Sequence, residues 1–308
     1  MIVLRGGPIR DQHLEREVVL GAAAYGPPGR DRVRRMAERA DLGAMRREVR
    51  RFEVARRFGA ALRDQRGAFP TWPFTVFAGE GFDPSGEHDD LQGYWKLEEA
   101  SGTRVDSHTG GLDLTDNNTV TQAAGKQGNA AQFTAANTET LTRADTAALS
   151  MGAEVSFFIA LWAYLDVTTA RDLIHKASVT NQAYGFEYTL RLQGADFLFR
   201  VGDGASVSGT VQSGLTLATA TWYFVAMWHD ATANTVNINV NNGTTASTAY
   251  SGGSHDSAGA FTLGGHADSG FHDGRLDEVA VWKRIPKTGE INYLYNGGTG
   301  RTYPLTTS

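Results

Sequence analysis

The residues best suited to acid–base chemistry are two pairs of adjacent acids, Glu98-Glu99 and Asp277-Glu278. Hydrolysis of a glycosidic bond needs two carboxylates across that bond, ~5 to 5.5 Å apart in a retaining mechanism. Neighbouring side chains of a β-strand point to opposite faces, so neither pair is expected to line one site. No acidic triplet of the form Glu-x-Asp-x-x-Glu, which would place carboxylates on one strand face, occurs in the chain. We therefore expect no enzymatic activity.

Histidine and aspartate crowd one late segment, as His255-Asp256, His266 with Asp268, and His272-Asp273. Such side chains coordinate several divalent metals, although no close ligand spacing such as His-x-x-x-His occurs. The alternative is that they are solvated residues of glycine-rich loops. The chain has no cysteine, which excludes zinc ribbons, disulfide frameworks, iron–sulfur clusters and thiol nucleophiles.

Charge divides the chain into two parts. Residues 1–90 hold 16 Arg, no Lys and 14 acids, for a formal charge of +2, and the remaining residues carry −7. Between residues 30 and 66, apolar residues recur at three- and four-residue steps with Arg between them, which predicts one or two amphipathic helices. This face has three interpretations: a solvated surface with i,i+4 ion pairs, a contact with a partner protein, or a nucleic-acid or membrane surface. The interleaved acids disfavour nucleic acid, so we expect no nucleic-acid partner.

An aromatic segment follows this helical region. Residues 68–77 read Ala-Phe-Pro-Thr-Trp-Pro-Phe-Thr-Val-Phe, which is too short and too proline-broken to form a core. Exposed aromatic side chains at this density usually pack against another surface. We therefore predict that residues 1–90 form an anchoring arm, ordered by another chain or by folding back on the C-terminal part, and that the protein is oligomeric. The expected partner contacts of the arm are Phe69, Trp72, Phe74, Phe77, Arg46, Arg50 and Arg57.

The rest of the chain is expected to be mainly β, because short apolar runs alternate with Gly, Asn, Asp, Ser and Thr. Val236, Ile238 and Val240 alternate with polar residues, which predicts one buried and one solvated strand face. The following Asn241-Asn242-Gly243 is a hairpin signal.

Two other segments, 155–165 and 221–228, are apolar on both faces and are expected in the middle of a sheet. One helix is predicted over residues 288–295, ended by Asn296-Gly297-Gly298. About 210 residues of this kind predict one antiparallel two-sheet sandwich or jelly roll.

Four segments, in order, resemble the laminin-G-like, concanavalin A-like jelly rolls found in bacterial and phage proteins. The segments are Gly93 to Gly102, Lys126 to Phe133, Thr221 to Val225, and Asp273 to Val279 with Trp282, Arg284 and Leu294-Tyr295-Asn296. The resemblance runs from about residue 91 to residue 298 and implies a jelly-roll sandwich. Residues 1–90 have no counterpart in that family.

The resemblance also implies a structural Ca²⁺, since such sandwiches often bind one through an early loop and the closing strand. The matching residues are Asp106 and Asp277, whose oxygens would join two distant parts of the chain. The alternative is that Asp277 caps a turn. No other cofactor is expected.

These observations predict three segments: an anchoring arm at 1–90, a sandwich at 91–300 and a tail at 301–308. We expect a non-enzymatic structural and binding protein displayed on a larger assembly, most simply a phage virion as capsid decoration or tail-associated protein. The alternatives are a carbohydrate-binding lectin-type module and a bacterial surface adhesion domain. The chain shows no Sec signal and no apolar run long enough to span a membrane, so we expect cytoplasmic synthesis and a virion-surface or extracellular location.

Glycan binding, if present, is expected at the polar loops of the sandwich, over residues 181–184, 202–206 and 252–258. Their aromatic content is low, so we expect weak glycan affinity.

Overall fold

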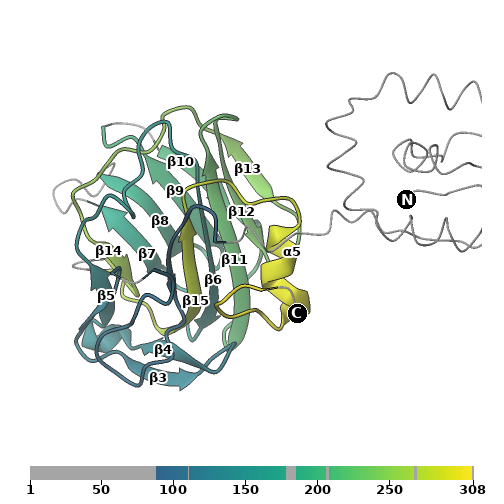
Figure 1. Cartoon of the computed structure of the whole chain (residues 1–308). Helices are drawn as coiled ribbons and strands as arrows, with labels where there is room; N and C mark the ends of the chain where they lie inside the picture. The colour runs from purple at the N-terminus through teal and green to yellow at the C-terminus, as the bar shows by residue number, and fades with distance from the viewer. Residues whose placement is uncertain (1–87, 110, 178–184, 206–207, 267–268, 307–308) are drawn as a thin grey trace, which may run out of the picture. The chain divides into compact units, whose positions relative to one another are not determined.

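The computed structural model of the chain describes residues 88–109, 111–177, 185–205, 208–266 and 269–306 (Figure 1). These residues all belong to one of the two units into which the chain divides, Phe82–Ser308. The predicted partner contacts of the arm lie outside the described residues; they are Arg46, Arg50, Arg57, Phe69, Trp72, Phe74 and Phe77.

One sheet of the sandwich has eight antiparallel strands, in the order β13-β12-β11-β6-β15-β4-β3, with β1 paired to β15. Its strands are β1 (Leu91–Trp95), β3 (Thr121–Ala124), β4 (Asn129–Phe133), β6 (Phe157–Leu165), β11 (Thr221–Asp230), β12 (Thr235–Val240), β13 (Ala246–Ala249) and β15 (Gly274–Trp282). Strand β6 lies in the middle, between β11 and β15, which is the place expected for a segment apolar on both faces.

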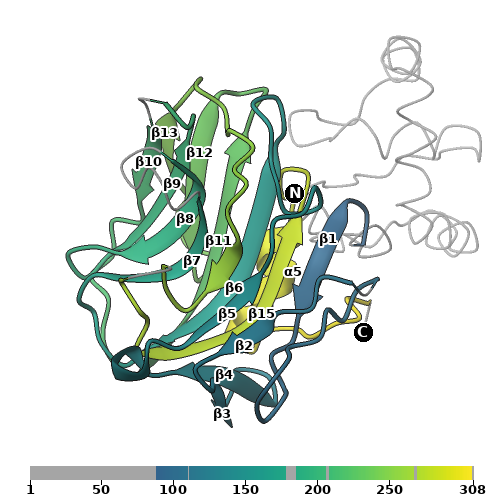
Figure 2. The same ribbon diagram turned by 90° about the vertical axis from the view of Figure 1, so that its left-hand side faces the viewer.

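The other sheet has seven strands in the order β10-β9-β8-β7-β14-β5-β2 and faces the first sheet (Figure 2). Its strands are β2 (Thr115–Asn117), β5 (Thr140–Arg143), β7 (Arg171–Ala177), β8 (Phe186–Leu192), β9 (Phe197–Gly202), β10 (Ser208–Gln212) and β14 (Phe261–Leu263). A short 3₁₀ turn, η4 (Ala135–Asn137), connects β4 to β5. The mainly β, two-sheet antiparallel sandwich predicted from the sequence is confirmed.

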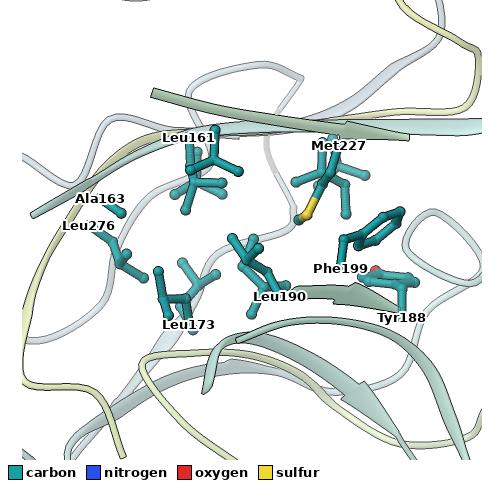
Figure 3. Packing of buried hydrophobic residues seen from close by; sticks show 14 of the residues in the cluster. Leu161, Ala163, Leu173, Tyr188, Leu190, Phe199, Met227 and Leu276 are labelled. Carbon is teal, nitrogen blue, oxygen red and sulfur yellow. The ribbon is translucent and has the colours of Figure 1, made fainter. Parts of the chain in front are cut away.

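The main hydrophobic core fills the space between the two sheets. Figure 3 shows Leu161 and Met227 from the eight-stranded sheet facing Leu190 and Phe199 from the seven-stranded sheet. Alternate side chains of each strand enter this layer because successive residues point to opposite faces. Each fully buried Leu- or Phe-sized side chain contributes roughly 1.5–3 kcal/mol.

A second apolar cluster lies on the outer face of the eight-stranded sheet, under the C-terminal segment. Helix α5 (Glu290–Tyr295) and the 3₁₀ turn η5 (Asn296–Gly298) cross this face, where Tyr295 stacks on Trp162 with ring centroids 5.8 Å apart. Phe158 stacks on Trp282 beside them, at 4.8 Å. Strand β6 is therefore buried on both sides. Among the described residues, no helix combines the length and apolar character needed to cross a bilayer.

Local sequence signals are confirmed with two corrections. Asn241 and Asn242 both have positive φ, and the Gly243 N–H donates to the Val240 carbonyl, as the hairpin signal predicted. The helix expected over 288–295 begins only at Glu290, because the preceding Gly289 adopts a left-handed conformation.

The second correction concerns the polar face of β12, which was expected to be solvated. Asn237 and Asn239 on that face are only 6% and 4% exposed. They are tolerated there because their amides are hydrogen-bonded, Asn239 Nδ2 donating to the Gly243 carbonyl at 2.7 Å and Asn237 Nδ2 to Thr235 Oγ1 at 2.9 Å.

Candidate functional site

Polar side chains gather on the outer face of the seven-stranded sheet. In β8 and β9, Leu190, Leu192 and Phe199 enter the core between the sheets. Arg191 and Arg200 occupy the alternate positions and therefore point to the outer face.

These outer positions form a continuous row across the sheet, because directly opposed residues of antiparallel strands share one face. The strand registers pair Arg200 with both Thr210 and Thr189, then Thr189 with His175. The row continues through β14, β5 and β2. From one edge of the sheet to the other, the polar row is Thr210, Arg200, Thr189, His175, Thr262, Thr142 and Thr115.

Phe186 joins this face beside Arg200. The register shift between β7 and β8 leaves Glu187 as an extra residue, which turns Phe186 to the outer face. The Arg200 guanidinium lies over the Phe186 ring, 4.3 Å from its centroid, and its Nε donates to Thr189 Oγ1 at 3.4 Å. The ring contact keeps the guanidinium beside Phe186 on this face of the sheet.

A second line of residues runs beside the polar row. Asp172 and Arg191 are opposed in β7 and β8, with Arg191 Nε 3.6 Å from Asp172 Oδ1. Burial raises the pKa of Asp172, and the nearby Arg191 and Arg200 oppose that rise. This face therefore combines two guanidinium groups with one carboxylate.

Two histidines meet in the middle of this face. The rings of His175 and His266 pack edge to face, with centroids 4.2 Å apart. Burial, reinforced by His266, Arg200 and Arg191, lowers the pKa of His175 to about 3. His175 is therefore neutral at physiological pH and presents one ring N–H donor and one ring nitrogen acceptor.

The predicted calcium ligand Asp277 is fully buried in β15, where its Oδ2 accepts the N–H groups of Lys126 and Gln127 at 2.7 and 2.9 Å. Burial raises the pKa of its carboxyl to about 7. Gly125 makes room for this contact, because a Cβ there would lie 2.7 Å from Asp277 Oδ2. Asp277 thus caps the turn between β3 and β4, as the alternative interpretation expected.

The other predicted ligand, Asp106, serves a different segment. Its Oδ1 accepts the N–H groups of Tyr94 and His108 at 3.1 and 3.0 Å, and its Oδ2 is buried without a hydrogen-bond partner in the described part of the chain. Within that part, no three His, Asp or Glu side chains come together to hold a metal ion. The calcium site stays a prediction.

The adjacent acids of β15 correct one expectation. Glu278 has a positive φ and lies at a bulge between Asp277 and Ala280, so both acids turn toward the outer apolar cluster instead of to opposite faces. Glu278 Oε2 accepts the hydroxyl of Tyr94. Both side chains are buried, at 0% and 4% exposure, so a substrate does not reach them. The second acid pair caps loops instead: Glu98 Oε2 accepts the Asn129 N–H and Glu99 Oε1 the Val105 N–H, both at 2.8 Å.

The histidine-rich segment does not form one cluster. His272 is fully buried against Phe133, and burial lowers its pKa to about 4. His255 Nδ1 lies 3.3 Å from the Gly202 carbonyl. Only His266 reaches the polar face, while its expected neighbour Asp268 lies outside the described residues.

Sequence reasoning missed the polar face as a site. The predicted glycan loop 181–184 lies outside the described residues, as does Ser206 of the loop 202–206. The available signal was the placement of Arg191 and Arg200 between core residues of two neighbouring strands. That spacing predicts that each arginine lies on the outer face of its strand. The order of the strands in the sheet was needed to show which outer residues are neighbours.

Comparison with known proteins agrees with this architecture. A laminin G family profile, described as the concanavalin A-like lectin/glucanases superfamily, matches residues 136–292. No curated protein matches the chain.

Several solved structures share the fold at low identity. The binding domain of Paraclostridial Mosquitocidal Protein 1 has a TM-score of 0.58 and 12% identity, covering 68% of this chain and 53% of that one. A botulinum neurotoxin type C structure has a TM-score of 0.53 and 12% identity, covering 70% and 53%. The botulinum neurotoxin serotype G binding domain has a TM-score of 0.52 and 12% identity, covering 67% and 50%.

The chain spans about half the length of these structures, and at such identity the likeness concerns the fold alone. The family profile, in contrast, covers half of the chain itself. The chain therefore belongs to the concanavalin A-like lectin/glucanase superfamily, with a laminin-G-like domain as its sandwich.

Proposed function

We propose that this protein is a non-catalytic carbohydrate-binding module that binds a saccharide on the outer face of the seven-stranded sheet. The observation that carries the proposal is the polar row, in which Thr210, Arg200, Thr189 and His175 follow one another on neighbouring strands. Since a sheet spaces neighbouring strands ≈ 4.7–4.9 Å apart, the row offers hydrogen-bonding groups at regular intervals.

The chemistry of this row suits a polyol. Threonine hydroxyls both donate and accept, a neutral imidazole does the same through its two nitrogens, and a guanidinium adds five donors. Sugar hydroxyls also donate and accept, so each can pair with members of the row. The edge strands keep Thr210 and Thr115 exposed, while Thr189 at the centre is fully buried by its neighbours.

The proposal includes that the protein does not hydrolyse the saccharide it binds. Asp172 is the carboxylate of the described polar face, and its partner Arg191 lies beside it. A glycosidase needs a second carboxylate across the scissile bond. The other paired acids, Asp277 and Glu278, are buried under the opposite sheet's outer cluster.

The comparisons support a binding role. Two of the similar solved structures are described as binding domains of toxins, and entry of botulinum neurotoxin type C into cells depends on two ganglioside molecules. We propose by analogy an extracellular or surface location. Display of the sandwich on a larger assembly such as a phage virion, through residues 1–90, rests on sequence alone and belongs to the same proposal.

The test is a glycan array followed by titration calorimetry with the full-length protein. We expect His175→Ala and Thr210→Val each to weaken binding of the selected glycan by about tenfold, the scale of one lost hydrogen bond of about 1.4 kcal/mol. Thr248→Val is the matched control, since Thr248 is exposed on β13 of the other sheet. Thermal unfolding of each variant establishes that it is folded.

Two results would contradict the proposal. One is the absence of any bound glycan, and the other is a bound glycan whose affinity is unchanged in both row variants. Release of reducing ends from the bound glycan, abolished by Asp172→Asn, would show instead that the face is catalytic.

A further inference from the structure

We infer that the saccharide bound by this face carries an isolated anionic group, a carboxylate or a sulfate, which pairs with Arg200. The inference rests on the proposed function, because it assigns a chemical class to the ligand of the same site. It follows from the charge balance of the polar face and from the partners that Arg200 has in the fold.

Among the described residues, the polar face holds two guanidinium groups and one carboxylate, which is one cation more than the carboxylate balances. Arg191 has Asp172 opposite it, with Nε and Oδ1 3.6 Å apart. Arg200 has no carboxylate partner among the described residues, and Arg191 and Asp172 are the charged groups that act on it. Burial and the neighbouring Arg191 both lower the pKa of Arg200, so the guanidinium, which stays charged, lies in an unfavourable environment in the free protein. An anion beside it would remove this penalty.

The surroundings of Arg200 leave its guanidinium able to contact an anionic group of a ligand. Its ring contact with Phe186 and its Nε bond to Thr189 fix the guanidinium plane at the centre of the row. In the described part of the chain, the two terminal nitrogens of Arg200 donate no hydrogen bond, yet they are not sealed from solvent. These four N–H groups match the two oxygens of a carboxylate, or two of a sulfate, in the bidentate manner typical of arginine.

The rest of the molecule favours an isolated charge over a dense polyanion. Residues 91–308 carry a formal charge of −7, so a nucleic acid or a strongly anionic peptide is repelled by most of the surface. The exposed hydroxyl of Thr210 lies opposite Arg200 and, with the half-buried His175 ring, offers partners for neutral sugar hydroxyls. A single negative group placed among hydroxyls is the arrangement found on an acidic saccharide.

The experiment uses the full-length protein and an array built from matched pairs: uronic-acid oligosaccharides with their methyl esters, and sulfated galactans with their desulfated forms. We expect the anionic member of a pair to bind about tenfold more tightly in low salt. Comparing the two pairs distinguishes a carboxylate from a sulfate. Polyglutamate and single-stranded DNA are included as polyanions without sugar hydroxyl patterns of this kind.

Arg200→Gln is expected to weaken binding of both members, because Arg200 belongs to the polar row, but to weaken the anionic member about tenfold more, so that the preference for the anionic member is lost. Arg200→Lys keeps the charge and is expected to retain part of the preference. Arg275→Gln is the matched control, because Arg275 lies over Tyr164 on the other sheet. Thermal unfolding shows whether each variant is folded, and Arg191→Gln, which removes the neighbouring cation, is the second test if Arg200→Gln does not fold.

The outcomes separate this inference from the proposed function. Tight binding of neutral saccharides without an anionic preference would overturn the inference and leave the proposed function standing. Binding of no saccharide at all would overturn both. Equal or tighter binding of polyglutamate or DNA, lost in Arg200→Gln, would show a general anion surface and would also overturn the inference.

Discussion

At the scale of single residues, three buried carboxyls titrate far from their ordinary range. Burial raises the pKa of Asp277 and of Glu187 to about 7, and that of Glu278 to about 8. In an unfolded chain these groups titrate near pH 4. These three carboxyls therefore bind more protons in the folded protein than in the unfolded chain above that pH, and their contribution to stability falls as the pH rises from about 4 through 7 to 8. Half-buried His175 and buried His272, whose pKa is lowered to about 3 and about 4, act in the opposite direction up to about pH 6.5.

Asp277→Asn tests this linkage at one residue. The amide oxygen can still accept the N–H groups of Lys126 and Gln127, but it carries no charge. We expect the variant to lose less stability than the wild type between pH 5 and 8, the difference in slope reaching up to about 1.4 kcal/mol per pH unit. Urea unfolding at several pH values measures it, with the exposed Asp256→Asn as control. Parallel curves for wild type and Asp277→Asn would contradict the assignment.

If the predicted calcium site exists, Asp277→Asn should destabilise the protein, because the variant loses a calcium ligand. If Ca²⁺ joins Asp106 and Asp277, binding to the native state alone adds about 2.7 kcal/mol at a hundred times Kd. A chelator should then lower the Tm of the wild type, and Asp277→Asn should have that lower Tm without chelator. A Tm that does not respond to chelator or to added Ca²⁺ would show that the two carboxylates act only as turn caps.

At the scale of elements, irregular strand pairing determines toward which face of the sheet two acidic side chains point. Register shifts in β8 and β15 displace Glu187 and Glu278 from the faces that strict alternation would give them. Glu187 is turned inward to Lys176, whose Nζ lies 3.2 Å from Glu187 Oε2 and 2.8 Å from Asp145 Oδ1. The same ammonium donates to the carbonyls of Ser257 and Gly259, at 2.8 and 3.0 Å. These bonds hold the loop that contains Ser257 and Gly259 against β7.

Lys176→Met is expected to destabilise the fold strongly. It removes the ammonium and leaves the fully buried Glu187 without its cationic partner, although the Met151 and Ser257 N–H groups still donate to it. Breaking a buried ion pair in this way typically costs 3–5 kcal/mol. The double variant Lys176→Met/Glu187→Gln should recover part of the loss, because no buried charge remains. Chemical denaturation measures both, with Lys96→Met as control at a half-buried position. Equal stabilities of the single and double variants would show that the Glu187 charge costs nothing once Lys176 is removed, which would contradict this account.

At the scale of the whole sandwich, two apolar layers share β6. One layer lies between the sheets and the other lies between the eight-stranded sheet and the C-terminal segment. Since the same strand contributes to both layers, loss of either layer exposes the side of β6 that it covers to solvent. The sandwich should therefore unfold as one unit, including α5.

A fragment of residues 88–308 tests this cooperativity. We expect a single sharp thermal transition for it, and none for a fragment of residues 1–87, whose apolar residues are too sparse for a core. Ending the first fragment at residue 288 should lower its Tm, because Trp162 and Phe224 lose their contacts with Tyr295. A sharp transition of the isolated 1–87 fragment would contradict the anchoring-arm prediction.

The sequence by itself determined the class of fold. Alternation in residues 235–240, doubly apolar runs such as 157–165 and the turn residues Asn241-Asn242 are local signals, and local backbone preferences decide them. Motifs spread along the chain were enough to indicate the superfamily.

Only the tertiary structure decided the candidate site. Arg200, Thr189, His175 and Thr262 come from four strands whose order in the sheet differs from their order in the chain, so no sequence spacing relates them. Likewise, the bulge at Glu278 and the turn beneath Asp277 depend on pairing with distant segments. Local periodicity assigns a residue to a face, whereas the neighbours on that face are set by long-range strand pairing and burial.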